Sequence, residues 1–221
     1  MRHGQTRSNV LGLLDSRVPG PDLTVLGSRQ AAAVPYAFRA RPVSSVTVSH
    51  MIRTAQTAAP LAAERSLEVA VEPGVGEIPA GDLEMTSGVE AMAGYGRAAW
   101  AWAAGDLDPR MAGSENGHEF FARFDDVVDR ILLRGEELPL IVSHGASIRV
   151  WVGNRCGNVP DSFGAESELH NTGTALVERD TRGRWELVDW VAMPAGGAHL
   201  HGRSGPEDDG PTGSITQESI D

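Results

Sequence analysis

The chain begins MRHGQTRSN, which places Arg2, His3 and Gly4 in succession, and a second histidine, His144, follows far downstream in the segment VSHG. An unprotonated imidazole can attack phosphorus as a nucleophile. A neighbouring guanidinium can bind the phosphoryl oxygens and stabilise the negative charge that grows on them. Residues of these types predict phosphoryl transfer chemistry that needs no metal ion.

Further polar side chains follow segments that have the pattern of strands. Arg53 comes after the apolar run SVTVS and opens a helical pattern, where backbone N–H groups and an arginine can bind an anion together. Glu77 and His144 follow the runs LEVAV and LPLIVS. Because open α/β sheets build their ligand crevices at the carboxyl ends of their strands, we expect these side chains to converge with His3.

Short runs rich in valine and isoleucine predict strands, and they alternate with segments of helical periodicity. This alternation predicts a three-layer α/β/α sandwich with a mostly parallel central sheet. The predicted strands are residues 45–49, 67–71, 138–143, 174–178 and 185–191, and the predicted helices are residues 24–39, 52–64, 90–104, 114–133 and 146–155.

The composition excludes several classes of protein. A formal net charge of -11 and a pI near 5.0 disfavour binding to nucleic acid or to an anionic membrane surface. The single cysteine, Cys156, excludes an internal disulfide and any cysteine-based metal cluster. With no membrane-spanning run and no signal-peptide pattern, the sequence predicts a cytoplasmic protein.

The chain changes character near its C-terminus. Residues 1–194 predict one globular domain, whereas residues 195–221 are rich in glycine, proline, serine and acidic side chains. This segment has little apolar surface to bury, so we predict a disordered acidic tail. His199 and His201 lie within it, and a histidine pair without a third ligand does not predict a metal site.

Five separated motifs, in this order, resemble those of the histidine phosphatase superfamily, which includes cofactor-dependent phosphoglycerate mutases and many small-molecule phosphatases. The resemblance covers residues 2 to about 174 and implies the phosphoglycerate mutase-like fold. The motifs are R-H-G-x-x-x-x-N from Arg2 to Asn9, L-T-x-x-G-x-x-Q-A from Leu23, the segment around Arg53, E-x-x-x-G-x-x-E from Glu77, and S-H-G around His144.

The resemblance implies a role for each matching residue. His3 is then the nucleophile that accepts the phosphoryl group, and Glu77 is the acid that protonates the leaving oxygen and later activates water. The phosphate-binding residues are then Arg2, Asn9, Arg53 and His144. No cofactor is implied, and the expected partner is a small phosphomonoester.

These roles set opposite electrostatic demands. His3 must be unprotonated, and fixed positive charge on nearby arginines should lower its pKa. An acid such as Glu77 must have its pKa raised by burial or by an anionic neighbour, and the bound phosphate is such a neighbour. Asp82 and Glu84 lie close in sequence and stay open as alternatives to Glu77.

The segment between the acid and the second histidine distinguishes branches of the family. Mutases of the family carry a run of arginines and a proline-rich stretch there. In residues 94–120 of this chain only Arg97 and Arg110 are basic, and the element Gly113–Glu115 is similar to the phosphatase branch. We therefore expect water to be the final phosphoryl acceptor. A phosphoglycerate mutase and a non-catalytic phosphate-binding protein on the same fold stay open as alternatives.

Three aromatic residues of this segment, Tyr95, Trp100 and Trp102, allow two interpretations. They could line a pocket for the leaving group, or they could fix a helical cover to the sheet.

One feature departs from the family. Relatives place a hydrophobic strand directly before the R-H-G motif, whereas only Met1 precedes it here. Methionine is a natural last residue of such a strand, so we expect the first strand to be missing through a late start. The sheet should then show a gap beside His3.

Overall fold

A computed structural model gives the structure of the protein and describes residues 1–202. Strands β1, β2 and β3 form a parallel sheet in the order β2-β1-β3, and β4 and β5 form a separate antiparallel pair. The strands are β1 (Ser45–Val48), β2 (Val69–Val71), β3 (Pro139–Val142), β4 (Thr174–Arg179) and β5 (Trp185–Val191).

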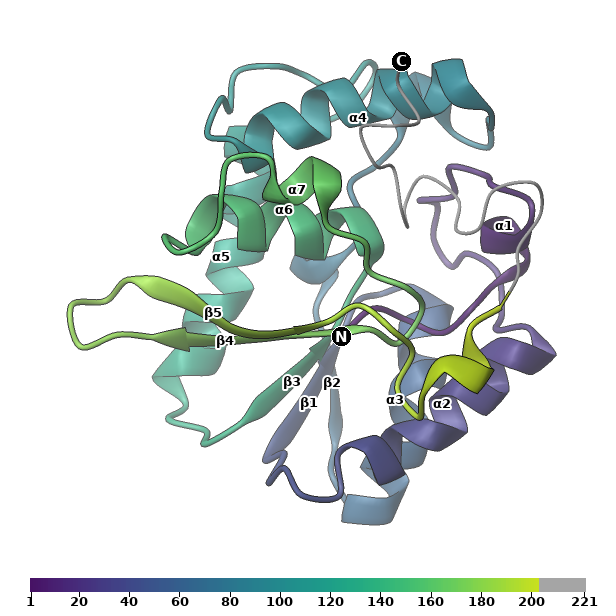
Figure 1. Ribbon diagram of the computed structural model, residues 1–221, viewed down its shortest axis with the longest axis vertical. Coiled ribbons are helices and arrows are strands. Elements are labelled where there is room, and N and C mark those ends of the chain that lie inside the picture. The colour runs from purple at the N-terminus through teal and green to yellow at the C-terminus, as the bar shows by residue number, and fades with distance from the viewer. Residues whose placement is uncertain (203–221) are drawn as a thin grey trace.

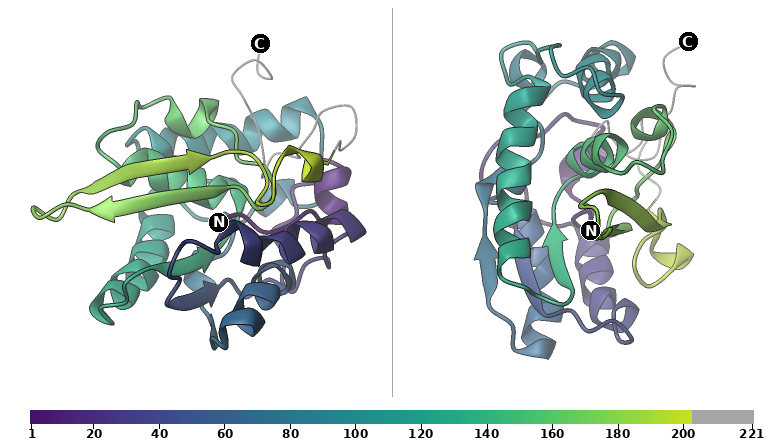
Figure 2. Two further views of the ribbon diagram at one scale, coloured as in Figure 1. Left: turned by 60° about the horizontal axis from the view of Figure 1, so that its bottom comes forward. Right: turned by 90° about the vertical axis from the view of Figure 1, so that its left-hand side faces the viewer.

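Helices cover the parallel sheet on both sides (Figures 1 and 2). The α-helices are α1 (Arg7–Val10), α2 (Val25–Ala37), α3 (Ile52–Arg65), α4 (Val89–Ala103), α5 (Gly117–Leu133), α6 (Gly145–Arg155) and α7 (Phe163–Glu166). Three short 3-10 helices are η1 (Pro73–Val75), η2 (Gly81–Leu83) and η3 (Ala198–Leu200). The predicted α/β fold with three layers is confirmed.

The alternation of side chains along β3 divides the core in two. Leu140 and Val142 face the cluster formed with α2 and α3, while Ile141 between them packs against the cluster on α5 and α6. Helix α5 presents six apolar residues to this second cluster because they recur at helical spacing. They are Phe120, Phe121, Phe124, Val127, Val128 and Ile131.

The first three residues lie between β3 and the start of β4 and pair with both. The Met1 amine donates to the Ile141 carbonyl (2.8 Å), and the Ser143 N–H donates to the Met1 carbonyl (2.9 Å). On the other side, the Arg2 N–H donates to the Gly173 carbonyl (3.0 Å). Figure 1 marks the N-terminus at this point, where β3 and β4 meet. His3 is therefore held by backbone pairing on two sides.

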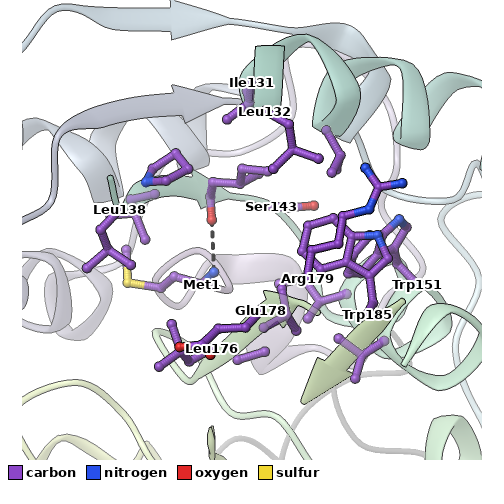
Figure 3. A pocket seen from close by; sticks show the side chains of 18 of the residues that line it. Met1, Ile131, Leu132, Leu138, Ser143, Trp151, Leu176, Glu178, Arg179 and Trp185 are labelled. Atoms are coloured by element: carbon purple, nitrogen blue, oxygen red, sulfur yellow. Dashed lines mark hydrogen bonds between the residues drawn. The ribbon is translucent and has the colours of Figure 1, made fainter. Parts of the chain in front are cut away.

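The sheet is interrupted upstream of Met1, where the gap was expected. Edges of β3 and β4 face each other across a cavity of about 550 Å³, shown in Figure 3, rather than across a paired strand. The mostly parallel sheet predicted from the sequence is present as β1, β2 and β3. β4 and β5 pair with each other and not with the parallel sheet, because nothing among the described residues bridges β3 to β4 along this stretch.

The predicted tail begins at residue 195, and its first eight residues are described. Residues 195–202 pack on the domain: Ala195 and Leu200 are buried, and the Gln30 side chain donates to the Leu200 carbonyl (2.9 Å). The His201 ring lies against the His170 ring, with 4.3 Å between ring centroids. The rest of the predicted tail, residues 203–221, lies outside the described residues.

Six apolar residues joined in front of Met1 should raise the melting temperature by about 10 °C. Each buried backbone group that gains a partner contributes roughly 1–3 kcal/mol, and 1 kcal/mol shifts the melting temperature of a domain of this size by about 2–4 °C. Calorimetry would compare this variant with a matched glycine–serine extension of the same length. Equal melting temperatures for the two extensions would contradict the expectation.

Candidate active site

The R-H-G motif is positioned by close contacts to α2 and α3. The Gly4 N–H donates to Oγ1 of Thr57 on α3 (2.8 Å). A Cβ on Gly4 would lie 2.8 Å from the Gly27 carbonyl oxygen, and one on Gly27 would lie 2.1 Å from that of Gln5. Only glycine fits at both positions. This contact explains why the first two motifs of the sequence occur together.

The His3 ring is held in one tautomer. Its Nδ1 lies 2.7 Å from the Gly4 carbonyl oxygen, which can only accept, so Nδ1 carries the hydrogen. Nε2 lies 3.2 Å from Nε of Arg53, which can only donate. Nε2 therefore carries no hydrogen, and its lone pair accepts from Arg53. The nucleophilic nitrogen of a neutral histidine thus faces a guanidinium.

Arg53, at the start of α3, contacts both histidines. Its Nε also donates to Nδ1 of His144 (3.3 Å), so one N–H is shared between two rings at distances near the long end of the hydrogen-bond range. Its Nη2 donates to the Asp15 carbonyl (3.0 Å). Its Nη1 is buried and has no hydrogen-bond partner among the described residues. Arg53 can therefore offer donors to an incoming anion.

His144 lies two residues after the end of β3 and is the N-cap of α6. Because its Nδ1 accepts from Arg53, the hydrogen of the neutral ring lies on Nε2, which donates to Oγ of Ser49 (2.8 Å). The centroids of the His3 and His144 rings are 5.1 Å apart. A single phosphoryl group can touch both rings across this distance. The structure thus brings His3, Arg53 and His144 together.

Both histidines favour the neutral form. Burial holds the pKa of His3 well below 6.5, and the guanidiniums of Arg53 and Arg2 lower it further. Burial, then Arg53 and His3, lower the pKa of His144 in the same direction. The guanidiniums remain charged, although burial lowers the pKa of Arg53 from its usual value. The site therefore combines neutral imidazoles with fixed positive charge.

The two other predicted phosphate ligands lie close to His3. Arg2 is fully buried and donates from Nη1 to the Leu169 carbonyl (2.6 Å). Asn9 forms a capping box with Thr6 at the start of α1, and its Oδ1 also accepts from Nδ2 of Asn171 (3.3 Å). The side-chain carbonyl of Asn9 thus accepts hydrogen bonds within the protein. A hydrogen bond from Asn9 to phosphate stays a prediction.

The Glu77 side chain lies against the amino end of α6, beside the first residues that follow His144. Its carboxylate accepts from the backbone N–H of Ala146 (3.3 Å) and from the N–H and hydroxyl of Ser147 (2.9 Å each). The side chain is 2% exposed. The carboxylate is therefore fixed beside the histidine pair by the amino end of a helix.

Arg123 of α5 holds the loop that carries Glu77. It donates to the carbonyl oxygens of Gly74, Gly76 and Glu77, and it forms an ion pair with Glu115 (2.6 Å). The predicted phosphatase-branch element Gly113–Glu115 thus has a structural contact with the loop of the candidate acid.

The two alternatives to Glu77 have other surroundings. Asp82 is exposed. The Glu84 carboxylate accepts from the backbone N–H of Ser16 (2.8 Å) and also from the Ser16 hydroxyl. Neither side chain has a hydrogen bond to the α6 turn of His144 among the contacts described, so the geometry favours Glu77.

The aromatic residues of the cover are mainly structural. Tyr95 and Trp102 are fully buried, and they donate to the carbonyl oxygens of Ile78 (2.9 Å) and Pro109 (2.7 Å). Trp100 stacks under the guanidinium of Arg149 at 4.3 Å from the ring centroid. This supports the interpretation that Tyr95 and Trp102 fix the helical cover.

Several residues of the site were not found from the sequence. Ser49 orients His144, Ser147 binds Glu77, Thr57 holds Gly4, and Asn171 donates to the His3 carbonyl (3.0 Å). Ser49, Thr57 and Ser147 each lie within a few residues of a motif, which is a usable signal. Asn171 reaches His3 from a distant loop, and only the fold shows that contact.

The neutral histidines predict that stability falls in acid. The unfolded chain binds protons below pH 6.5 that buried His3 and His144 do not, so the free energy of unfolding decreases as pH drops below that value. Each histidine contributes up to about 2 kcal/mol between pH 7 and pH 5, at about 1.4 kcal/mol per pH unit.

Urea unfolding at both pH values would compare the protein with His144→Gln. The variant should lose less stability in acid than the parent. An identical loss in both would contradict the buried neutral state of His144.

Two further properties bear on the site. Within residues 1–202, no three histidine, cysteine, aspartate or glutamate side chains group in a way that could hold a metal ion. No helix in the same part of the chain has both the length and the apolar character needed to cross a membrane.

The chain is similar to several known proteins. PE-PGRS family protein PE_PGRS11 of Mycobacterium tuberculosis is 34% identical over 90% of this chain, and the chain spans only 37% of that protein's length. A probable phosphoglycerate mutase GpmB of Yersinia enterocolitica is 29% identical over 90% of this chain and 93% of its own.

A solved mycobacterial glucosyl-3-phosphoglycerate phosphatase shares the fold, with a TM-score of 0.71 at 24% identity over 87% of this chain and 96% of its own. The family model for the histidine phosphatase superfamily (branch 1) matches residues 1–192, so the chain belongs to that superfamily.

Proposed function

We propose that this chain is a phosphatase that hydrolyses a small-molecule phosphomonoester through a phosphohistidine on His3, without a metal or other cofactor. The observation that carries the proposal is the shared N–H of Arg53. This N–H donates to the Nε2 lone pair of a neutral His3 and to His144. The centroids of the two histidine rings are 5.1 Å apart. A nucleophile and its charge-stabilising group are thus already in place.

The first chemical step transfers the phosphoryl group to His3. Nε2 forms a bond to phosphorus while the bond from phosphorus to the ester oxygen breaks. The leaving oxygen takes a proton from the carboxyl group of Glu77, which must be protonated at that moment. Arg2, Arg53 and His144 bind the non-bridging oxygens, with Asn9 as a further donor.

The second step regenerates the enzyme. Glu77, now a carboxylate, removes a proton from water, whose oxygen attacks phosphorus as the bond to Nε2 breaks. Inorganic phosphate leaves, and His3 returns to its neutral form. Glu77 ends the cycle protonated, as it began.

Substrate binding should replace the weak hydrogen bonds of the resting site. Arg53 shares one N–H over 3.2 and 3.3 Å, and charge-assisted bonds to phosphate oxygens are shorter and about twice as strong as neutral ones. The exchange frees Nε2 of His3 for attack. Phosphate binding and nucleophile release are therefore one event.

Water is the favoured acceptor because the cover offers little basic surface for a phosphorylated intermediate. Arg97 is exposed, and Arg110 is engaged with Glu119 (2.8 Å) and the Ser114 carbonyl (2.8 Å). The likeness to a probable phosphoglycerate mutase keeps isomerisation as the second candidate. A panel of phosphometabolites assayed for released phosphate and for isomerised product separates the two.

His3→Ala should abolish turnover and phosphoenzyme formation. The expected loss of kcat is about 10⁴-fold or more, as for other covalent nucleophiles. Protein incubated with a ³²P-labelled substrate in EDTA and quenched in alkaline detergent would be assayed for label that is stable in base and released by acid. The matched control is His118→Ala, which removes an exposed histidine.

Turnover that survives His3→Ala but not EDTA would favour a metal-dependent mechanism. Phosphate binding without turnover in the unchanged protein would instead favour a non-catalytic binding protein.

Glu77→Gln should separate the two steps. With p-nitrophenyl phosphate, whose phenolate leaves without a proton, the variant should give a burst and accumulate phosphohistidine, because water activation is lost. With an alkyl phosphate, phosphorylation itself should slow by about 10²–10⁴-fold. Rapid-quench kinetics measure both.

Asp82→Asn is the matched control and should behave as the unchanged protein. Equal slowing of the burst with both substrates, or the same defects in Asp82→Asn, would exclude Glu77 as the acid.

A further inference from the structure

A loop of residues 15–20 lies against the guanidinium of Arg53. The backbone carbonyl of Asp15 accepts from Nη2 of Arg53 (3.0 Å). At the other end of the loop, Gly20 has a positive φ of 72°, and a Cβ there would lie 2.5 Å from Nη1. A larger residue at Gly20 would therefore displace the guanidinium. The loop thus borders both terminal nitrogens of the side chain to which the proposed function assigns phosphate binding.

One peptide group of this loop connects Arg53 to Glu84. The carbonyl of Asp15 and the N–H of Ser16 belong to the same trans peptide, which is planar, so the two groups point in opposite directions. The carbonyl accepts from Arg53 (3.0 Å), and the N–H donates to Oε1 of Glu84 (2.8 Å). Because the peptide group is rigid, a rotation that breaks one of these hydrogen bonds also moves the other.

The Glu84 carboxylate is held in place by further contacts. Its Oε2 accepts from the hydroxyl of buried Ser16, and this hydroxyl accepts in turn from the N–H of Ala80 (2.8 Å). The N–H of Glu84 donates to the carbonyl of Gly81 (3.1 Å). Both carboxylate oxygens are therefore engaged, and the carboxylate is fixed with respect to the loop that carries Glu77.

The Asp15 carbonyl is the contact that can hold Arg53 while phosphate binds. The other hydrogen bonds of the guanidinium among the described residues join Nε to His3 (3.2 Å) and to His144 (3.3 Å), and both are longer. Substrate replaces these two bonds in the proposed mechanism. An arginine side chain without an anchor would lose rotamer freedom on binding phosphate, which lowers affinity. A guanidinium that keeps its bond to Asp15 has already lost most of that freedom.

We propose that Glu84 is a positioning residue for Arg53. Its carboxylate fixes the peptide group between Asp15 and Ser16, and the carbonyl of that group holds the guanidinium in the orientation that binds phosphate. The inference rests on the proposed function, in which Arg53 binds the phosphoryl oxygens. Glu84 then differs in role from Glu77, because it acts through Arg53 and exchanges no proton with the substrate.

Three substitutions of Glu84 separate the reach of its side chain from its charge. Glu84→Ala removes the acceptor, so the affinity for inorganic phosphate should fall by about tenfold or more. The KM for p-nitrophenyl phosphate should rise to match, while kcat changes less. Glu84→Asp keeps the charge but is one methylene shorter, so it should resemble Glu84→Ala. Glu84→Gln keeps an acceptor at the same reach, so it should stay within about threefold of the unchanged protein.

A double-mutant cycle tests whether Glu84 acts through Arg53. In the Arg53→Ala background, Glu84→Ala should change phosphate affinity and kcat/KM by less than about twofold, because the guanidinium that it positions is gone. Ser16→Ala keeps the backbone N–H that Glu84 binds, so its effect should be about threefold or less. The matched control Asp82→Ala removes an exposed acid from the same loop and should have no effect. Affinities are measured by NMR titration with inorganic phosphate.

The inference is overturned where Glu84→Asp retains affinity and Glu84→Gln loses it, because charge and not the fixed peptide group would then matter. It is also overturned by equal affinity in all three variants and the unchanged protein, or by an equal loss from Glu84→Ala with and without Arg53. A loss from Ser16→Ala as large as that from Glu84→Ala, or no phosphate binding to the unchanged protein, has the same meaning. The comparison of Glu84→Asp with Glu84→Gln decides the matter even where Glu84→Ala fails to fold.

Failure of the proposed function gives a different result. Phosphate binding needs no turnover, so phosphate binding without hydrolysis by the unchanged protein overturns the phosphatase activity alone. If Glu84→Gln keeps the burst with p-nitrophenyl phosphate but slows phosphorylation by an alkyl phosphate, Glu84 is the acid, and the positioning role is overturned.

Discussion

The shared N–H of Arg53 is the interaction on which the site depends. One donor between two imidazoles requires that both accept, and both therefore have to be neutral. Burial and the charge of the guanidinium enforce that state together. The Gly4 carbonyl selects the tautomer of His3. The Arg53 N–H selects that of His144, whose Nε2 then donates to the Ser49 hydroxyl. In the proposed mechanism, the nucleophile is thus prepared before substrate binds.

This arrangement places positive charge inside an acidic protein. The chain carries a formal net charge of -11, yet Arg2, Arg53 and Arg149 are all buried. Each donates to a main-chain carbonyl, at Leu169, Asp15 and Ala165 respectively. Arginine suits this setting because its fork of donors is rigid and its charge survives burial. A local anion site can therefore exist on a molecule whose overall charge repels anions.

Much of the fold could be predicted from the sequence because its signals are local. The three parallel strands end at Val48, Val71 and Val142, close to the motifs of Arg53, Glu77 and His144, so strand ends and motifs predicted their convergence. The spacing of α5 predicted its buried face. Gly4 and Gly27 marked the contact between the first two motifs, although only the structure shows why both are glycine.

The remaining features depend on contacts that sequence distance hides. Asn171 reaches the His3 carbonyl across 168 positions, which no local pattern shows. β4 and β5 were predicted as strands, but their separation from the parallel sheet follows from the unpaired stretch beside β3. Residues 195–202 have the composition of a tail. They nevertheless pack on the domain, because the Leu200 carbonyl accepts from the Gln30 side chain and the Leu200 side chain is buried.

Nitrogen-15 NMR of the histidine rings at pH 6 tests this account most directly. The account predicts that His3 is neutral with its hydrogen on Nδ1 and that His144 is neutral with its hydrogen on Nε2. Titration with inorganic phosphate should move the resonances of both rings while leaving exposed His118 unchanged. An imidazolium spectrum for either buried ring at that pH, or the opposite tautomer at His3, would contradict the account, because no free lone pair would then face Arg53.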